Sequence, residues 1–139
     1  MTPTPDNRWK QRFENYQNAL AVLDSAVAAV QAAPEDILYR IALIQSFKFS
    51  WELGWKVLKD YLNYEGIEVQ PSPRQVIKQA FQQQIISDGQ LWIDMLEARN
   101  TMSHAYDNQK AQQAAKAIQR SYHPALVALS DYFTGRVTP

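Results

Sequence analysis

Residues 34–64 read PEDILYRIALIQSFKFSWELGWKVLKDYLNY and predict one long helix at the centre of the fold. Pro34 suits the first turn of a helix, and the two acidic residues after it favour the positive end of the helix dipole. An apolar stripe at heptad-like spacing consists of Ile37, Ile41, Ile44, Trp51, Trp55, Leu58 and Leu62. The other faces carry Phe47, Phe49, Leu53, Val57 and Tyr61. We therefore expect this helix to be buried on more than one side.

Helical periodicity continues on both sides of this segment. Residues 7–32 predict a long amphipathic helix, whose apolar face consists of Phe13, Tyr16, Leu20, Leu23, Val27 and Val30. After the central helix, Ser72 and Pro73 form a good helix start, a hydroxyl cap followed by proline. We expect a short helix from there to about Gln84, with inward-facing side chains at Val76, Ala80 and Phe81.

The C-terminal half predicts two further helices. Asp88 can cap a helix that begins at Gly89 and carries an apolar stripe of Leu91, Met95, Ala98 and Met102. Asp107 and Asn108 interrupt the chain or cap the last helix. This helix should span about Asn108 to Phe133, and Pro124 should kink it. Its core positions would be Ala111, Ala115, Ile118, Tyr122, Leu126, Leu129 and Phe133. The sequence thus predicts an all-α antiparallel bundle of four longer helices plus one short helix.

Length and composition set the outer limits of this fold. The 139 residues favour a single domain, 1–139, with frayed tails at 1–6 and 135–139. Basic and acidic residues balance at 14 each, so no overall field attracts polyanions. No run approaches the length of a membrane span and no apolar secretory region is visible, so we expect a soluble, cytoplasmic protein. Two histidines without a cysteine argue against thiol chemistry and zinc, and we expect neither metal nor cofactor.

Residues 97–107, EARNTMSHAYD, gather the side chains that are best suited to chemistry. The guanidinium of Arg99 can hold a phosphate and stabilise charge on its oxygens. His104 can move a proton to or from a ribose 2′-hydroxyl or a leaving oxygen, and Asn100 can orient the imidazole or the phosphate. Attack by the 2′-hydroxyl would leave a 2′,3′-cyclic phosphate without needing a metal. The same residue types also occur as helix caps and surface contacts, so the pattern alone leaves both interpretations open.

The geometry of a straight helix does not bring these groups to one atom. Arg99 and His104 would diverge by about 140° and rise by about 7.5 Å. Either the helix breaks near Ser103, or a second copy of the site lies opposite across a two-fold axis. We favour the second arrangement, because an isologous dimer also doubles the positive charge.

The pattern Arg99-Asn100-xxx-His104-x-Tyr106 resembles the R-N-xxx-H-x-Y signature of prokaryotic HEPN domains. Residues 47–56, FKFSWELGWK, resemble the aromatic-rich second helix of one HEPN subgroup, and Trp92-xx-Met95 matches it as well. This subgroup contains the HepT-type toxins, once described as nucleotidyltransferase substrate-binding proteins. The resemblance covers most of the chain, from Trp9 to Phe133.

The resemblance implies a helical homodimer that places two copies of the motif in one cleft. It implies a metal-independent ribonuclease, an endo- or exonuclease that often acts on tRNA and serves as a toxin. Arg99 and His104 would be catalytic and Asn100 supportive. The implied partner is a minimal nucleotidyltransferase of the MNT type, an antitoxin that transfers AMP to Tyr106. The alternative is a non-catalytic subunit that presents substrate to the nucleotidyltransferase.

Other polar and aromatic residues have competing interpretations. Lys48, Glu52 and Lys56 recur at i, i+4 and i+8, which favours an ion-pair ladder along one helix, although Lys48 is also a candidate RNA contact. Trp51 and Trp55 fall on the main stripe, so we interpret them as core or dimer interface rather than base-stacking residues.

Two more residues have a structural interpretation. His123 has no polar cluster near it in the sequence, and we expect a structural role. The competing interpretation of Tyr106 is a tyrosine that packs its ring and hydrogen-bonds its hydroxyl, as tyrosines on helices commonly do.

Overall fold

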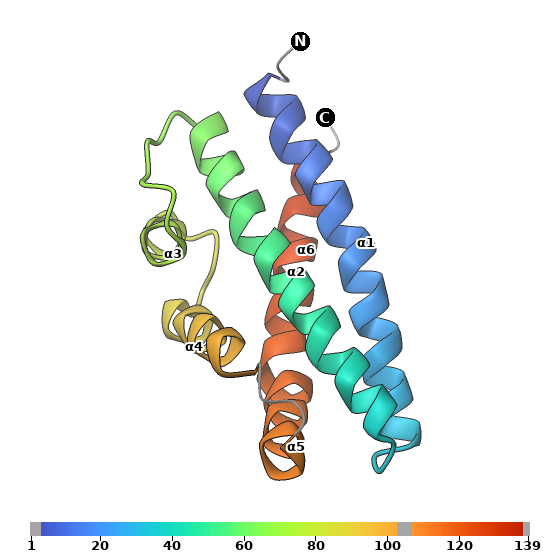
Figure 1. The fold of residues 1–139 in the computed structure, drawn as a ribbon. Coiled ribbons are helices and arrows are strands. Elements are labelled where there is room, and N and C mark those ends of the chain that lie inside the picture. The colour runs from blue at the N-terminus through green and yellow to red at the C-terminus, as the bar shows by residue number, and fades with distance from the viewer. Residues whose placement is uncertain (1–3, 103–106, 138–139) are drawn as a thin grey trace.

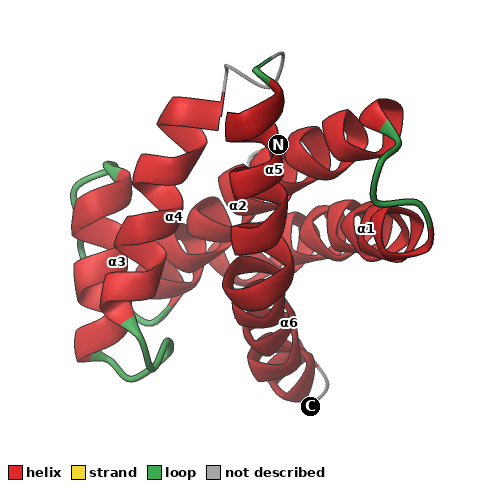
Figure 2. Ribbon diagram, turned by 90° about the horizontal axis from the view of Figure 1, so that it is seen from below, coloured by secondary structure: helices red, strands yellow, loops and turns green. Residues whose placement is uncertain are grey.

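The computed structural model describes residues 4–102 and 107–137, and all of their regular structure is helical (Figure 2). This confirms the predicted all-α class. In chain order the elements are α1 (Pro5–Ala32), α2 (Ile37–Tyr64), α3 (Pro73–Gln82), α4 (Gly89–Thr101), α5 (Asn108–Ala117), the π-helical turn η2 (Ile118–Tyr122) and α6 (His123–Val137). Within the described residues no helix is both long and apolar enough to cross a membrane.

The long helices form the body of the molecule. Helix α1 runs antiparallel to α2 and to α6, which both pack against it (Figure 1). Helices α3 and α4 contact each other and lie across the long helices, on the side of α2 that faces away from α1. The predicted antiparallel packing therefore holds for α1 with α2 and α6, whereas α4 lies across these helices and not along them.

Helix α2 is the centre of the fold, as its sequence predicts. It contacts α1, α3, α4, α5 and α6, and its side chains are buried on several faces. Gly54 permits the closest approach, since a Cβ atom there would lie 3.2 Å from the Tyr16 ring and 3.5 Å from the Trp92 ring. A Cβ atom at position 54 would require the Tyr16 ring to give way by a few tenths of an ångström.

Helix α1 buries the whole of its predicted apolar face, from Phe13 to Val30. The hydroxyl of fully buried Tyr16 donates a hydrogen bond to the backbone carbonyl of Leu126, 2.5 Å away, and so ties α1 to α6. Thr4 caps the helix by accepting from the Asn7 N–H at 3.3 Å, with Pro5 in the first turn. Helix α1 thus begins inside the segment 1–6 for which the sequence predicts a frayed tail.

The entrance of α2 differs from the prediction. Asp36 is the N-cap, because its carboxylate accepts from the N–H groups of Leu38 and Tyr39 at 2.9 and 3.3 Å. Pro34 and Glu35 form the preceding turn instead of the first helical turn. Ile37 is 60% exposed and Ile41 is also exposed, whereas the stripe from Ile44 to Leu62 is buried as predicted.

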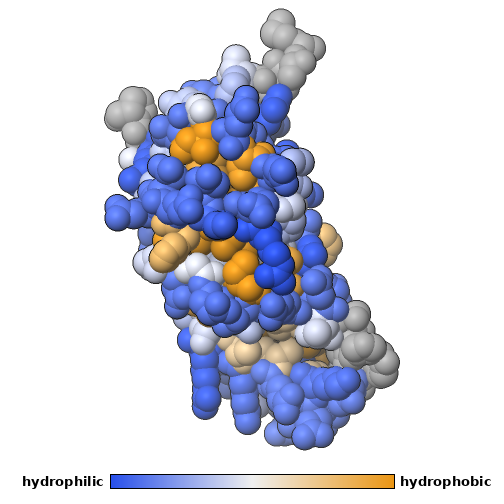
Figure 3. Space-filling model, turned by 90° about the vertical axis from the view of Figure 1, so that its left-hand side faces the viewer, coloured by the Kyte–Doolittle hydropathy of each residue, from blue (hydrophilic) through white to orange (hydrophobic). Residues whose placement is uncertain are grey.

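Two phenylalanines expected to pack inward are exposed. Phe49 is 68% exposed, so the described helices leave its side of α2 uncovered. Phe81 is 47% exposed, and Ile77 is buried in the inner face of α3 with Val76 and Ala80. Phe81 joins Ile77 and Ile93 in a shallow groove between α3 and α4. Figure 3 shows apolar patches separated by polar rows on this side of the molecule.

The C-terminal segment is one continuous helical run with an irregular middle. The predicted core positions are buried except Tyr122, which is half-buried. At Pro124 the sequence predicts a kink, and the structure has the π turn η2, which ends at Tyr122, just before α6. Proline has no N–H group to donate to a carbonyl of the preceding turn, and the wider π turn accommodates the missing hydrogen bond. Helix α6 continues to Val137, inside the segment 135–139 for which the sequence predicts a frayed tail. The caps predicted at Ser72, Asp88 and Asp107 are confirmed.

Tyr16→Phe should separate the contribution of the buried hydroxyl from that of the ring. Near neutral pH the variant should lose about 1 kcal/mol of unfolding free energy, the value of one hydrogen bond. Burial raises the pKa of Tyr16 well above its ordinary value, and Asp24 raises it further. Above pH ~10 the unfolded wild type therefore ionises before the folded one does, and its stability falls by up to about 1.4 kcal/mol per pH unit from this residue.

The measurement is urea unfolding of both proteins between neutral and strongly alkaline pH. The stability gap between wild type and Tyr16→Phe should narrow as the pH rises, because the variant lacks the titrating group. A stability difference between the two proteins that stays constant over this pH range would contradict the claim that the Tyr16 hydroxyl is buried.

Candidate functional site

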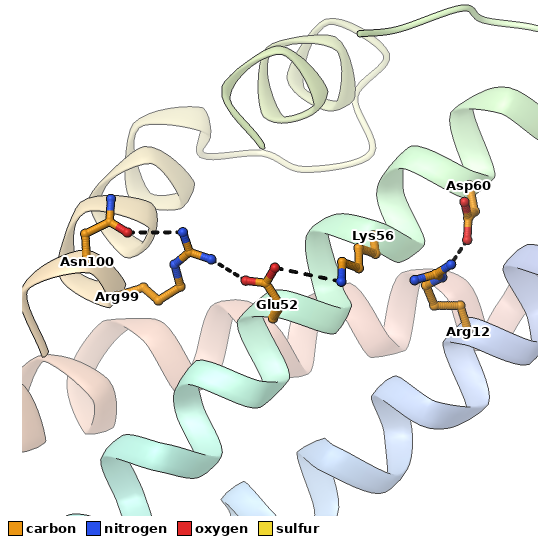
Figure 4. Close-up of polar contacts among 6 residues, drawn as sticks. All are labelled: Arg12, Glu52, Lys56, Asp60, Arg99 and Asn100. Carbon is orange, nitrogen blue, oxygen red and sulfur yellow. Dashed lines mark hydrogen bonds and ion pairs between the residues drawn. The ribbon is translucent and has the colours of Figure 1, made fainter. Parts of the chain in front are cut away.

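Arg99 lies in the last turn of α4 and reaches across to α2 (Figure 4). Its Nη1 group pairs with Oε2 of Glu52, and its Nη2 group donates to Oδ1 of Asn100 at 3.1 Å. The Asp88 cap and the apolar residues Met95 and Met102 fix α4 against the core, so the end of this helix has a defined position beside α2. A cation in the last turn is also favoured by the helix dipole.

Trp51 supplies the surface beneath this guanidinium. The Cζ atom of Arg99 lies 5.0 Å from the centroid of the Trp51 ring, and the indole is fully buried in α2. Such a cation–π contact adds to the ion pair from a second direction. The Arg99 side chain is therefore held by Glu52, Asn100 and Trp51, yet 27% of it stays exposed.

Glu52 links two cations from different helices. Its Oε2 meets Arg99, while its Oε1 lies 3.9 Å from the Nζ atom of Lys56 (Figure 4). The predicted pair between Glu52 and Lys56 is therefore confirmed. Lys48 does not extend the ladder, since no carboxylate pairs with it in residues 4–102 and 107–137.

A hollow of about 440 Å³ opens beside Arg99. Its walls come from α2 and α4 and consist of Gln45, Lys48, Phe49, Glu52, Arg99 and Asn100. Arg99 and Lys48 offer positive charge, the two amide side chains offer hydrogen bonds, and the exposed ring of Phe49 offers an apolar surface. Phosphate contacts and a stacking surface for a base are the features expected of a site for single-stranded nucleic acid.

A second hollow of about 600 Å³ lies on the other side of Asn100. It has an apolar floor that includes Ile44 and Ala114 and a polar rim that includes Lys110 and Tyr122. Tyr122 stacks on Phe47 with 5.3 Å between the ring centroids. Burial raises the pKa of Tyr122 and the Asp94 carboxylate raises it further, so its hydroxyl remains protonated and able to donate at neutral pH.

The structure brings together part of the residue set predicted from the sequence. Arg99, Asn100 and Lys48 line one hollow. His104 and Tyr106 lie outside the described residues, between Met102 at the end of α4 and the Asp107 cap of α5. Their roles remain predictions.

Sequence reasoning missed the partner and the platform of Arg99. Helical spacing predicts a pair for Glu52 only within its own helix, and it predicts only a core or dimer-interface role for Trp51. Trp51 is buried within this chain, as is Trp55, but Trp51 also contacts the guanidinium. The only hint of this contact in the sequence is that Glu52 is a single carboxylate in an otherwise apolar and basic stretch of α2. Its partner Arg99 lies 47 residues away in the chain.

His123 has the structural contact expected of it. Its Nε2 atom lies 2.5 Å from Oδ1 of Asp24 and connects the start of α6 to α1. It lines neither of the hollows beside Asn100.

A family model described as nucleotidyltransferase substrate binding protein like matches residues 11–134. The chain belongs to this family. The match confirms the resemblance to HepT-type, nucleotidyltransferase substrate-binding-like proteins, and it covers every helix of the bundle at least in part.

One curated relative and two solved structures are similar to the chain. The chain is 31% identical over 72 residues to the probable ribonuclease HepT of Haemophilus influenzae, and the match spans about half the length of that relative and of this chain, 49% of each. A solved structure from Haemophilus influenzae, described as revealing the fold of a substrate binding domain of a nucleotidyltransferase, shares the fold with a TM-score of 0.78, at 20% identity over 88% of this chain and 98% of that one. A Thermus thermophilus crystal structure aligns with a TM-score of 0.67 at 29% identity, over 89% and 99%.

Glu52→Gln tests whether the carboxylate holds Arg99 in place. Because both side chains are partly exposed, the unfolding free energy should change by no more than about 1 kcal/mol. The guanidinium protons of Arg99 should nevertheless exchange faster with water, as measured by ¹H–¹⁵N NMR. Glu97→Gln is the matched control, since Glu97 pairs at 3.4 Å with a different arginine, Arg74. Equal exchange at Arg99 in wild type and Glu52→Gln would contradict this role.

Proposed function

We propose that this protein is a metal-independent ribonuclease toxin that cleaves RNA, with tRNA as the substrate class. The observation that supports it best is the position of Arg99: its guanidinium is held in a fixed place beside an open hollow, with Asn100 and Lys48 next to it. Membership of a family with a relative called a probable ribonuclease supports the same proposal.

In this proposal Arg99 binds the phosphate at which the strand is cut. Lys48, Lys56 and Arg99 together outweigh the charge of Glu52, so the local field favours an anion although the chain as a whole is neutral. The phosphate takes up the exposed edge of the guanidinium while Glu52 keeps its other side in place. Asn100 adds a hydrogen bond to the same group or to His104.

His104 carries the proton transfer. The ribose 2′-hydroxyl attacks the adjacent phosphorus, its proton passes to a base, and the bond to the 5′-oxygen of the next nucleotide breaks as that oxygen gains a proton. The products are a 2′,3′-cyclic phosphate and a free 5′-hydroxyl. Histidine suits either transfer because it titrates near neutral pH.

A homodimer completes the site. Helix α4 ends at Thr101, so the geometry of one straight helix does not relate Arg99 to His104. The dimer is proposed because a second copy across a two-fold axis adds a second motif and doubles the positive charge. Exposed apolar side chains on α2, among them Ile41 and Phe49, provide surface for such pairing. Phe49 belongs to the hollow beside Arg99, which would place the site at the junction of the two copies.

An MNT-type nucleotidyltransferase is the proposed antitoxin, and Tyr106 is the residue that it adenylylates. An AMP group adds bulk and negative charge close to the motif. Its phosphate would compete with RNA for Arg99, and like-charge repulsion would disfavour the strand.

A second candidate function is a non-catalytic subunit that presents substrate to a nucleotidyltransferase. Two observations favour it: the description of the family, and the engagement of Arg99 by Glu52, which leaves the guanidinium only partly available. In this case the hollows beside Asn100 would bind the acceptor substrate without cutting it.

Cleavage of total tRNA in EDTA distinguishes the two functions. The wild type should cleave, and His104→Ala should lose at least about a hundredfold in rate, the usual contribution of general acid–base catalysis. Arg99→Ala should be similarly impaired. The matched controls are His123→Gln, which removes the other histidine, and Arg74→Ala, which removes a surface arginine paired with Glu97.

The opposite results are equally clear. Undiminished cleavage by His104→Ala would contradict the proposed mechanism. If the wild type is inactive and its intact mass shows no AMP on Tyr106, the protein is the substrate-binding subunit.

A further inference from the structure

A small basic hollow lies on the outer side of α1 and α2, apart from those beside Asn100. Its volume is about 340 Å³, and it is lined by Arg8, Gln11, Arg12 and Asn15 of α1 and by Leu53 of α2. The lining offers two guanidinium groups and two amide side chains but no carboxylate. Such a set of donors suits a phosphate, which arginine binds through its planar fork.

Arg12 is oriented by a buried acid. Asp60 of α2 is only 3% exposed, and its Oδ2 atom lies 2.7 Å from Nε of Arg12 (Figure 4). The contact is an ion pair and not an aligned hydrogen bond. It occupies Nε and leaves both terminal amino groups of Arg12 without a partner in residues 4–102 and 107–137. Arg8, one helical turn earlier, is exposed and has no ion pair within the same residues.

The basic hollow and Arg99 lie along the same row of α2. Glu52, Lys56 and Asp60 follow one another at steps of four residues, and Figure 4 shows Arg99 at the first of them and Arg12 at the last. Eight residues of α-helix separate these two contacts by about 12 Å. A span of this size is short enough for one RNA strand to contact both arginines.

We propose that Arg8 and Arg12, with Gln11 and Asn15, form a second phosphate subsite that binds the RNA backbone a few nucleotides from the phosphate at Arg99. Lys56 lies between the two positions and contributes positive charge along the path. This inference rests on the proposed function for its ligand, RNA, but assigns residues far from the motif. The subsite adds affinity and register, whereas the bond cleaved is chosen at Arg99.

Binding of a short 2′-O-methyl RNA tests the subsite independently of catalysis, because this RNA has no 2′-hydroxyl to attack. Fluorescence anisotropy over a range of salt concentrations gives Kd and its salt dependence. Arg8→Ala should weaken binding several-fold and reduce the slope of log K against log[salt] by about 0.7, the value for one single-strand phosphate contact. Arg12→Lys should weaken binding as well, while it keeps a cation beside Asp60 and so protects the fold. Lys78→Ala, an exposed cation on α3, is the control and should leave the slope unchanged.

The outcomes separate this inference from the ribonuclease proposal. Wild-type cleavage of tRNA, with the same Kd and slope in Arg8→Ala and Arg12→Lys, would overturn the subsite and leave the ribonuclease standing. Weaker binding by both variants, in a protein that never cleaves, would support the subsite and reject the ribonuclease. A wild type that does not bind the 2′-O-methyl RNA would overturn the subsite as an RNA site.

Discussion

The ion pair between Arg99 and Glu52 is the contact on which the candidate site depends. It joins α4, which crosses the bundle, to α2, which is buried at its centre, and the Trp51 ring supports the guanidinium from below. Because α2 is packed by helices on several sides, its backbone and the fully buried ring of Trp51 have little freedom to move. The packed core thus fixes the position of the groups that hold the partly exposed Arg99 side chain.

The sequence predicts those parts of the fold where local chemistry and burial agree. The apolar face of α1 and the caps Ser72, Asp88 and Asp107 follow from periodicity and hydrogen-bonding capacity, and the structure contains them. The predicted burial of Ile37, Phe49 and Phe81 is wrong for a common reason. Periodicity identifies an apolar face of a helix but does not tell whether another helix covers that face. Pro124 similarly predicts a disturbance, but not that a π turn absorbs it.

The site is only partly accessible to sequence reasoning. The motif resemblance selects Arg99 and Asn100, and these residues do adjoin in one hollow with Lys48. Glu52 and Arg12 could not be assigned in this way, since each pairs with a residue more than 45 positions away on another helix. Sequence spacing identifies neighbours within one helix, whereas pairs across helices depend on how the helices cross. Along α2, acids at positions 52 and 60 each hold an arginine from a different helix, so one row of side chains organises both proposed RNA contacts.

The most direct test of the central claim is a double-mutant cycle on the rate of tRNA cleavage, with Glu52→Ala, Arg99→Ala and the two combined. If Glu52 acts by positioning Arg99, its removal lowers the rate in the presence of Arg99 and changes it by less than about twofold once Arg99 is absent. Independent effects, in which the double variant loses the product of the two single losses, would contradict the account.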